Sequence, residues 1–187
     1  MCRTQLPVWQ EYYQSSTSHT FELFAVAMDA QGPDRVRSFA EEAGATYPVL
    51  VDRENILGEL FGFKVVPNVF IVDEAGVLRY QYVGGFSIKK PEVREELTRV
   101  LGQRFDQPSQ PAPPRTPFGA SAGLFAQGVR HYRAGRTAEA IEAWRQAWQL
   151  DPENFVIRKQ IWAVAAPERF YPRIDFDWQK ERLGRGE

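Results

Sequence analysis

Apolar positions in the first hundred residues follow two spacings, and one of them predicts four strands. Residues 21–27 form a nearly continuous apolar run, which is typical of a strand buried on both faces. Residues 47–51 are short and extended. Two further runs, one starting just after Pro67 and one over residues 77–83, flank a turn at 74–76 and predict an antiparallel hairpin. Proline can open a strand but not sit in its middle, so the position of Pro67 fits this assignment.

The other spacing predicts helices between these strands. Leu6, Trp9 and Tyr13 are three and four residues apart, which indicates a helix over residues 4–14. Pro7 is tolerated best in a first turn, so this helix should start near Arg3. Three more helices are predicted, each bounded by a proline or a glycine. The first starts at Pro33 and ends at Gly44. The second covers 55–61 and ends at Gly62, and the third covers 91–101 and ends at Gly102.

The second half of the chain has a different pattern. Residues 103–118 contain five prolines from Pro108 to Pro117 and predict an extended, fairly stiff linker. Residues 119–165 have helical periodicity, and 166–187 form an aromatic-rich tail that we expect to fold back over the helices or the sheet. The sequence therefore predicts an α/β domain over 1–102, the linker, and a small helical module.

Composition excludes several classes of function. The chain has 187 residues, of which 43% are hydrophobic, and a formal net charge of -1, so it has no electrostatic pull towards nucleic acid. No apolar run has the length of a membrane span, and no signal peptide is recognisable. The expected location is cytoplasmic by default, or extracytoplasmic if an N-terminal anchor has been lost. His19 and His131 are far apart, so no metal site is expected.

Cys2 is the only cysteine and therefore the only candidate for thiol chemistry. A thiolate can attack a disulfide sulfur, but one cysteine cannot form a disulfide within the chain. Without further context, a lone cysteine such as Cys2 is usually an inert thiol, either buried or exposed at the terminus. Both interpretations remain open on the residues alone.

Residues 2–101 resemble the thioredoxin fold and, within it, the TlpA/ResA group of thiol-disulfide oxidoreductases. The order and spacing of several short segments carry this resemblance. They are Cys-Arg at 2–3, Leu-Pro at 6–7, Phe-Ala-Val at 24–26, Tyr-Pro-Val-Leu-Val-Asp at 47–52, Leu-Phe-Gly-Phe-Lys-Val-Val-Pro at 60–67, and Phe-Ile-Val-Asp-Glu-Ala-Gly at 70–76.

The resemblance implies thiol-disulfide oxidoreduction on protein disulfides, without a metal or organic cofactor. Cys2 matches the second, resolving cysteine of a Cys-x-x-Cys helix. Pro67 matches the cis-proline beside the redox pair, and Val66 would carry the backbone that pairs with bound substrate. Gln5 stands where ResA-like members commonly carry a glutamate, so an acid/base helper is not implied.

The chain departs from the family in lacking the attacking cysteine and the central strand that normally precedes it. One hypothesis accounts for both: Met1 is an internal residue of a Cys-x-Met-Cys motif in a longer protein. In-frame stop codons directly ahead of Met1, with no cysteine codon, would contradict it. One thiol cannot cycle as a dithiol, so the alternative function is a non-catalytic scaffold for protein binding. A peroxidase is disfavoured because nothing resembles a Thr-x-x-Cys loop.

Residues 121–154 resemble a single tetratricopeptide repeat. The residues that carry this resemblance are Leu124, Gly128, Tyr132, Ala140, Trp144, Ala147 and Pro152. Small residues would let two helices approach closely, and the aromatic residues would fill the space between them. One repeat cannot bury its own face, so the module is either a structural appendage or a binding surface for a protein partner.

Overall fold

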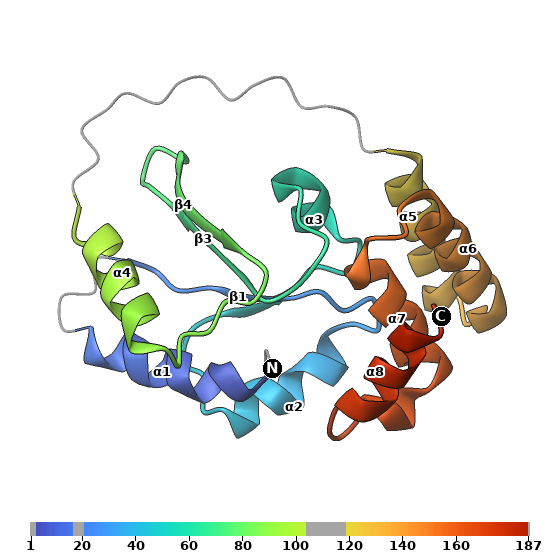
Figure 1. Ribbon diagram of the computed structural model, residues 1–187, viewed down its shortest axis with the longest axis horizontal. Coiled ribbons are helices and arrows are strands. Elements are labelled where there is room, and N and C mark those ends of the chain that lie inside the picture. Colours follow the sequence, from blue (N-terminus) through green and yellow to red (C-terminus); the bar gives the residue numbers. More distant parts are fainter. Residues whose placement is uncertain (1–2, 17–20, 104–118, 187) are drawn as a thin grey trace. The chain divides into compact units, whose positions relative to one another are not determined.

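The computed structural model describes residues 3–16, 21–103 and 119–186. The chain divides into two compact units, Met1–Phe118 and Gly119–Glu187, which are described separately (Figure 1). Except for Gln103, the predicted linker lies outside the described residues.

The N-terminal unit mixes helices and strands, in agreement with the predicted α/β class. Its helical elements are η1 (Arg3–Gln5), α1 (Leu6–Ser15), α2 (Pro33–Glu42), α3 (Ile56–Phe61) and α4 (Pro91–Leu101). Its strands are β1 (Ala25–Ala27), β2 (Val49–Val51), β3 (Asn68–Val72) and β4 (Leu78–Val83). Prolines occupy the first turns of α1, α2 and α4, where a missing N–H costs nothing.

The strands of the described residues form two separate pairs. β1 lies parallel to β2, with Val26 opposite Leu50. β3 and β4 form the predicted antiparallel hairpin, with Phe70 opposite Gln81. No described strand joins the two pairs into one sheet.

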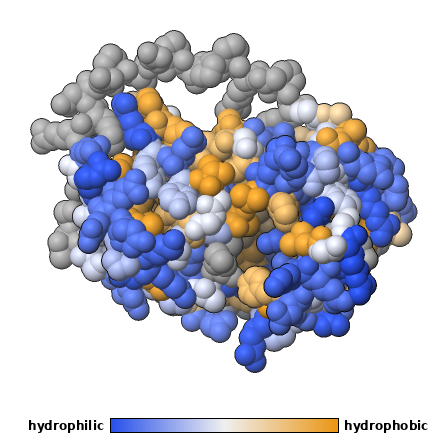
Figure 2. All heavy atoms as spheres, in the orientation of Figure 1, coloured by the Kyte–Doolittle hydropathy of each residue, from blue (hydrophilic) through white to orange (hydrophobic). Residues whose placement is uncertain are grey.

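The prediction of a strand over residues 21–27, buried on both faces, is wrong in extent and in burial. Only Ala25–Ala27 is a strand, and the side chains of Phe24 and Val26 are 55% and 37% exposed. Leu50, which pairs with Val26, is 50% exposed, so one face of the β1–β2 pair is open. An apolar run indicates burial only as an average over its residues. In this strand half-buried and exposed side chains alternate, because β1 has one described neighbouring strand. Figure 2 shows apolar side chains on the surface of this unit.

The core of the N-terminal unit lies between the hairpin and two helices. Phe86, Ile88, Val93 and Leu97 are buried there, and side chains from α1, β3 and β4 pack against them. Trp9 of α1 stacks on Phe86 with ring centroids 5.7 Å apart. This cluster attaches α1 and α4 to one face of the hairpin (Figure 1).

Asp73 organises the turn of the hairpin. Its carboxylate accepts hydrogen bonds from the backbone N–H groups of Ala75 and Val77, both at 2.9 Å, and from Arg79 Nε at 2.6 Å. The hydrogen bond from the Val77 N–H lowers the pKa of Asp73. Desolvation of the carboxyl group opposes this shift, and Arg79 adds to it. The ionised carboxylate therefore stabilises the hairpin.

We predict that Asp73→Asn removes a pH-dependent contribution to stability. Because the folded pKa lies below the unfolded value of about 3.9, this contribution is present above that value and is lost as the pH falls through the folded pKa. Urea unfolding at pH 7 and pH 3 measures the free energy of unfolding of wild type and variant. The difference between the two proteins should be smaller at pH 3 than at pH 7. Glu74→Gln is the matched control, because it removes an exposed charge from the same turn. An equal difference at both pH values would contradict the prediction.

The C-terminal unit is helical. It contains α5 (Ala120–Arg133), α6 (Thr137–Leu150), α7 (Phe155–Ala165), a short η2 (Pro167–Arg169) and α8 (Phe176–Gly184). The predicted helices over 119–165 are present, whereas α8 was not expected within the aromatic tail. Its N-terminus is capped by Asp175, which accepts a hydrogen bond from Trp178 N–H at 2.9 Å. No helix of the described residues is long and apolar enough to cross a membrane.

α5 and α6 approach closely at Gly128. A Cβ atom added to Gly128 would lie 2.3 Å from Trp144 Nε1, so the indole occupies the space that a side chain would need. Trp144 is fully buried and its Nε1–H donates to the Phe125 carbonyl at 3.0 Å. This close contact is confirmed, while the resemblance to a tetratricopeptide repeat stays a prediction.

The aromatic tail packs on α7. Of the two surfaces expected to receive it, the helices and the sheet, it therefore covers the helices. Trp162 of α7 forms a buried cluster with Phe170, against which Trp178 of α8 packs edge-on. Arg158 lies over the ring of Trp148, 4.5 Å from its centroid. These contacts cover α7 without a further repeat.

We predict opposite effects for two alanine substitutions in α5. Gly128→Ala forces a Cβ into Trp144 and should destabilise the unit by about 1–3 kcal/mol. Gly123→Ala meets nothing within 4 Å and should stabilise α5 by about 0.4–1 kcal/mol. Thermal unfolding followed by far-UV circular dichroism measures both. If Gly128→Ala were at least as stable as Gly123→Ala, the close contact would not exist in solution.

Candidate functional site

The turn before β3 contains both residues predicted to face a substrate. Val66 and Pro67 are half-buried, and the peptide bond between them is cis, as is that between Tyr171 and Pro172. The backbone of Val66 has no hydrogen-bond partner among the described residues. The N–H and C=O of Val66 are therefore groups that this turn can offer to an extended peptide.

Asn68 connects this turn to the end of β4. Its Nδ2 donates to the Val65 carbonyl at 2.6 Å, and its Oδ1 accepts from the Gly84 N–H at 2.7 Å. One side chain therefore binds the backbone on both sides of the entry to the hairpin. Gly84 has a φ of 74°, and a Cβ there would lie 3.0 Å from Val65 Cγ2. Glycine is thus required both by the backbone conformation and by the approach of Val65.

Gln5 fastens the start of α1 to the segment that follows Gly84. Its side chain is 3% exposed, and its Nε2 donates to the Phe86 carbonyl at 2.9 Å. Its Oε1 accepts from the Ile88 N–H, also at 2.9 Å. Both polar ends of this buried amide are satisfied, so Gln5 holds two backbone groups in place.

Two more polar contacts hold the other side of α1. The Tyr47 hydroxyl donates to the Leu6 carbonyl at 3.1 Å, and burial raises the pKa of this phenol. The phenol therefore remains protonated as a donor. The Gln10 side chain binds both the N–H and the hydroxyl of Thr46.

Cys2, the predicted resolving thiol, lies outside the described residues, so its place relative to Pro67 stays a prediction. Gln5 and Asn68 both bind the segment 84–88, which relates the start of α1 to the Val66–Pro67 turn. Sequence reasoning missed the role of Asn68. The available signal was an asparagine directly after Pro67, because short amides readily bond to nearby backbone.

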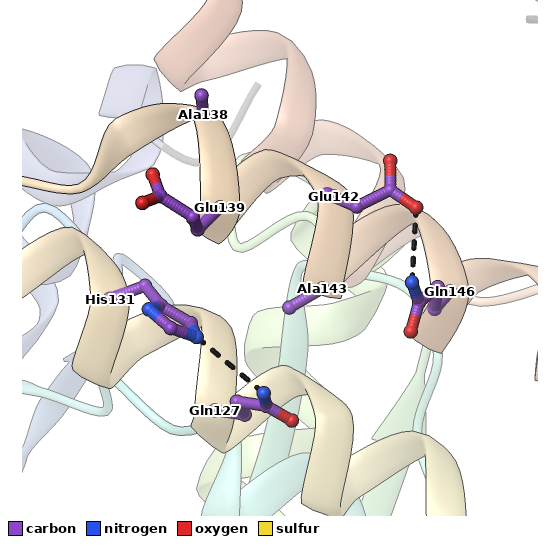
Figure 3. A pocket seen from close by; sticks show the side chains of 7 residues that line it. All are labelled: Gln127, His131, Ala138, Glu139, Glu142, Ala143 and Gln146. Atoms are coloured by element: carbon purple, nitrogen blue, oxygen red, sulfur yellow. Dashed lines mark hydrogen bonds between the residues drawn. The ribbon is translucent and has the colours of Figure 1, made fainter.

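A surface pocket of about 370 Å³ lies between α5 and α6. Figure 3 shows its lining, which consists of Gln127, His131, Ala138, Glu139, Glu142, Ala143 and Gln146. Glu142 accepts a hydrogen bond from Gln146, and His131 Nδ1 accepts one from Arg136 Nε at 3.1 Å. No group of three potential metal ligands occurs among the described residues. Polar side chains of both helices and two alanines line this pocket.

The N-terminal unit is similar to known redox proteins. Residues 1–81 match the AhpC/TSA family. This match and the curated relatives below support a thioredoxin-like unit of the thiol-disulfide oxidoreductase type.

The curated relatives are bacterial. The thiol-disulfide oxidoreductase ResA of Geobacillus thermodenitrificans (strain NG80-2) is 24% identical over 99 residues, which cover 53% of this chain and 55% of the relative. The thiol-disulfide oxidoreductase YkuV of Bacillus subtilis (strain 168) is 27% identical over 106 residues, which cover 55% of this chain and 70% of the relative. The thioredoxin-like protein YneN of the same strain is 26% identical over 100 residues, covering 51% and 56%. The chain thus spans about half the length of the ResA relative.

We predict that Gln5→Glu destabilises the protein by about 1–3 kcal/mol at pH 7. The new side chain cannot donate to the Phe86 carbonyl when ionised, and it places a charge in a buried site. Burial should raise its folded pKa above the unfolded value of about 4.3, so the deficit should grow as the pH rises above about 4. Urea unfolding measures it.

Gln14→Glu, on the exposed side of α1, is the matched control and should change stability by less than about 0.5 kcal/mol. Equal stabilities for the two variants at pH 7 would show that Gln5 does not hold the segment in solution.

Proposed function

We propose that the N-terminal unit acts in thiol-disulfide exchange with protein disulfides, as an oxidoreductase of the thioredoxin/TlpA-like type. In this proposal Cys2 is the resolving thiol, and Val66 and Pro67 form the surface that receives the substrate backbone. The attacking thiol is not among the 187 residues. The single observation that carries the proposal is the backbone of Val66, which has no hydrogen-bond partner in the described part of the chain, at a turn held by Asn68.

The chemistry requires a mixed disulfide in which an attacking thiol is already joined to the substrate. The Cys2 thiolate attacks the sulfur of the attacking thiol, a new disulfide forms there, and the substrate sulfur leaves as a thiolate that takes up a proton from water. Cys2 is oxidised and the substrate cysteine is reduced. A substrate peptide paired with Val66 would be held in an extended conformation during this step.

The strand pairing supports the same proposal. β1–β2 and β3–β4 are separate pairs, so each pair has two edges without a described neighbour. Unpaired edges attract further strands because their N–H and C=O groups seek partners. A strand between the two pairs, as the family resemblance implies, would join them into one sheet.

A glutathione-linked peptide tests the proposed role of Cys2. Glutathione stands in for the attacking thiol in a disulfide with the cysteine of an eight-residue peptide. The 187-residue protein should release the peptide thiol faster than a short synthetic peptide of its first ten residues does, and it should become glutathionylated. Cys2→Ser should abolish both effects. Thiol release and mass spectrometry provide the measurements.

The alternative function is a non-catalytic scaffold for protein binding. It would be favoured if the folded protein reacted no faster than the ten-residue peptide. In that case, the exposed apolar residues of β1 and β2 and the α5–α6 pocket would be the surfaces on which to seek a partner.

A further inference from the structure

The orientation of the Val66 N–H is set by a neighbouring group. The carbonyl of Val65 and the N–H of Val66 belong to one planar peptide unit, and this unit is trans. In a trans peptide the carbonyl and the N–H point in opposite directions. Whatever holds the Val65 carbonyl therefore also fixes where the Val66 N–H points.

The group that holds this carbonyl is the side chain of Asn68. The bond from its Nδ2 to the Val65 carbonyl is 2.6 Å long, and the N–H of Val66 consequently points away from Asn68. Asn68 is itself held, because its Oδ1 accepts the Gly84 N–H at 2.7 Å and its backbone pairs with Val83 in the hairpin register. Its side chain cannot rotate without breaking both bonds.

The segment next to Gly84 is in turn anchored to the core. Phe86 is 1% exposed and stacks on Trp9, and Gln5 binds the carbonyl of the same residue. The Val65–Val66 peptide is thus linked through one amide side chain to a segment that is anchored in the buried core cluster. The neighbouring residues Val65, Val66 and Pro67 have no charged group that could replace this link.

We infer that Asn68 is a positioning residue, which presents the Val66 N–H to the carbonyl of an extended peptide next to the reacting disulfide. The inference rests on the proposed function, since it assigns a further residue to the same site. A peptide substrate gains a preformed hydrogen-bond donor, whereas a disulfide without peptide groups gains nothing. Asn68 therefore controls the preference for peptide disulfides over small ones.

The test compares two substrates of the full chain. One is the glutathione-linked eight-residue peptide, and the other is bis(2-hydroxyethyl) disulfide, which has no peptide groups. Asn68→Ala should slow exchange with the peptide by about three- to tenfold, the equivalent of one net hydrogen bond, and leave the rate with the small disulfide unchanged. Gln81→Ala is the matched control, because it truncates an exposed amide on β4 of the same hairpin.

The outcomes separate the two proposals. The quantity compared is the ratio of the exchange rate with the peptide substrate to the rate with the small disulfide. If this ratio is no higher for the wild-type protein than for the synthetic peptide of its first ten residues, the proposed function fails. If wild type favours the peptide and Asn68→Ala keeps the full preference, the positioning role is wrong. Equal slowing with both substrates also overturns it, because only a general structural role would affect both. Should Asn68→Ala not fold, Asn68→Asp keeps the acceptor for Gly84 and should lose the same preference, since Val65 then lacks its donor.

Discussion

The rest of the N-terminal unit depends on the segment 84–88, whose backbone is bound by side chains from two distant parts of the unit. Gln5 holds it from the start of α1, and Asn68 holds it from the start of β3. Phe86 in its middle is buried in the core against Trp9. Buried backbone groups must find hydrogen-bond partners, and an irregular segment has no ladder to supply them. Two amide side chains meet this requirement here and thereby relate α1 to the turn at Val66 and Pro67.

In the C-terminal unit, backbone groups find their hydrogen-bond partners within the helices, and neighbouring helices pack against one another. α5 and α6 are joined by a short turn at Gly135, which has a φ of 76°, and Trp144 fills the contact at Gly128. A helical hairpin satisfies its backbone internally, so only its apolar stripe needs cover. α7 and the aromatic cluster of Trp162, Phe170 and Trp178 extend the packing along the same part of the chain. A structural role thus requires no array of repeats, and the α5–α6 pocket remains available at the surface.

The sequence predicted the elements whose signals are local. The β3–β4 hairpin, α4 with its closing glycine, and the start of α2 at Pro33 follow from periodicity and from proline and glycine positions. The short β1 was overestimated, because an apolar run does not reveal how many neighbours a strand has. α8 was missed, because its cap at Asp175 lies within an aromatic stretch of weak periodicity. The role of Gln5 was not predictable, since its partners are 81 and 83 residues away. For Asn68 only the bond to Val65, three residues away, had a local signal, whereas its partner Gly84 is 16 residues away. Of the three predicted site residues, Val66 and Pro67 share one turn, and Cys2 lies outside the described residues.

The long separation between Gln5 and its partners affects the order in which this unit can assemble. α1 is attached by bonds to residues 86 and 88 and by the contact of Tyr12 with Thr98, which close loops of more than eighty residues. Closing such loops costs chain entropy that is recovered only when the contacts form together. A ribosome synthesises the chain from its N-terminus, so α1 leaves the exit tunnel long before its anchoring segment exists. Until then α1 can contact only nearer partners such as Thr46 and Tyr47, so its packing against the core cluster forms late in synthesis.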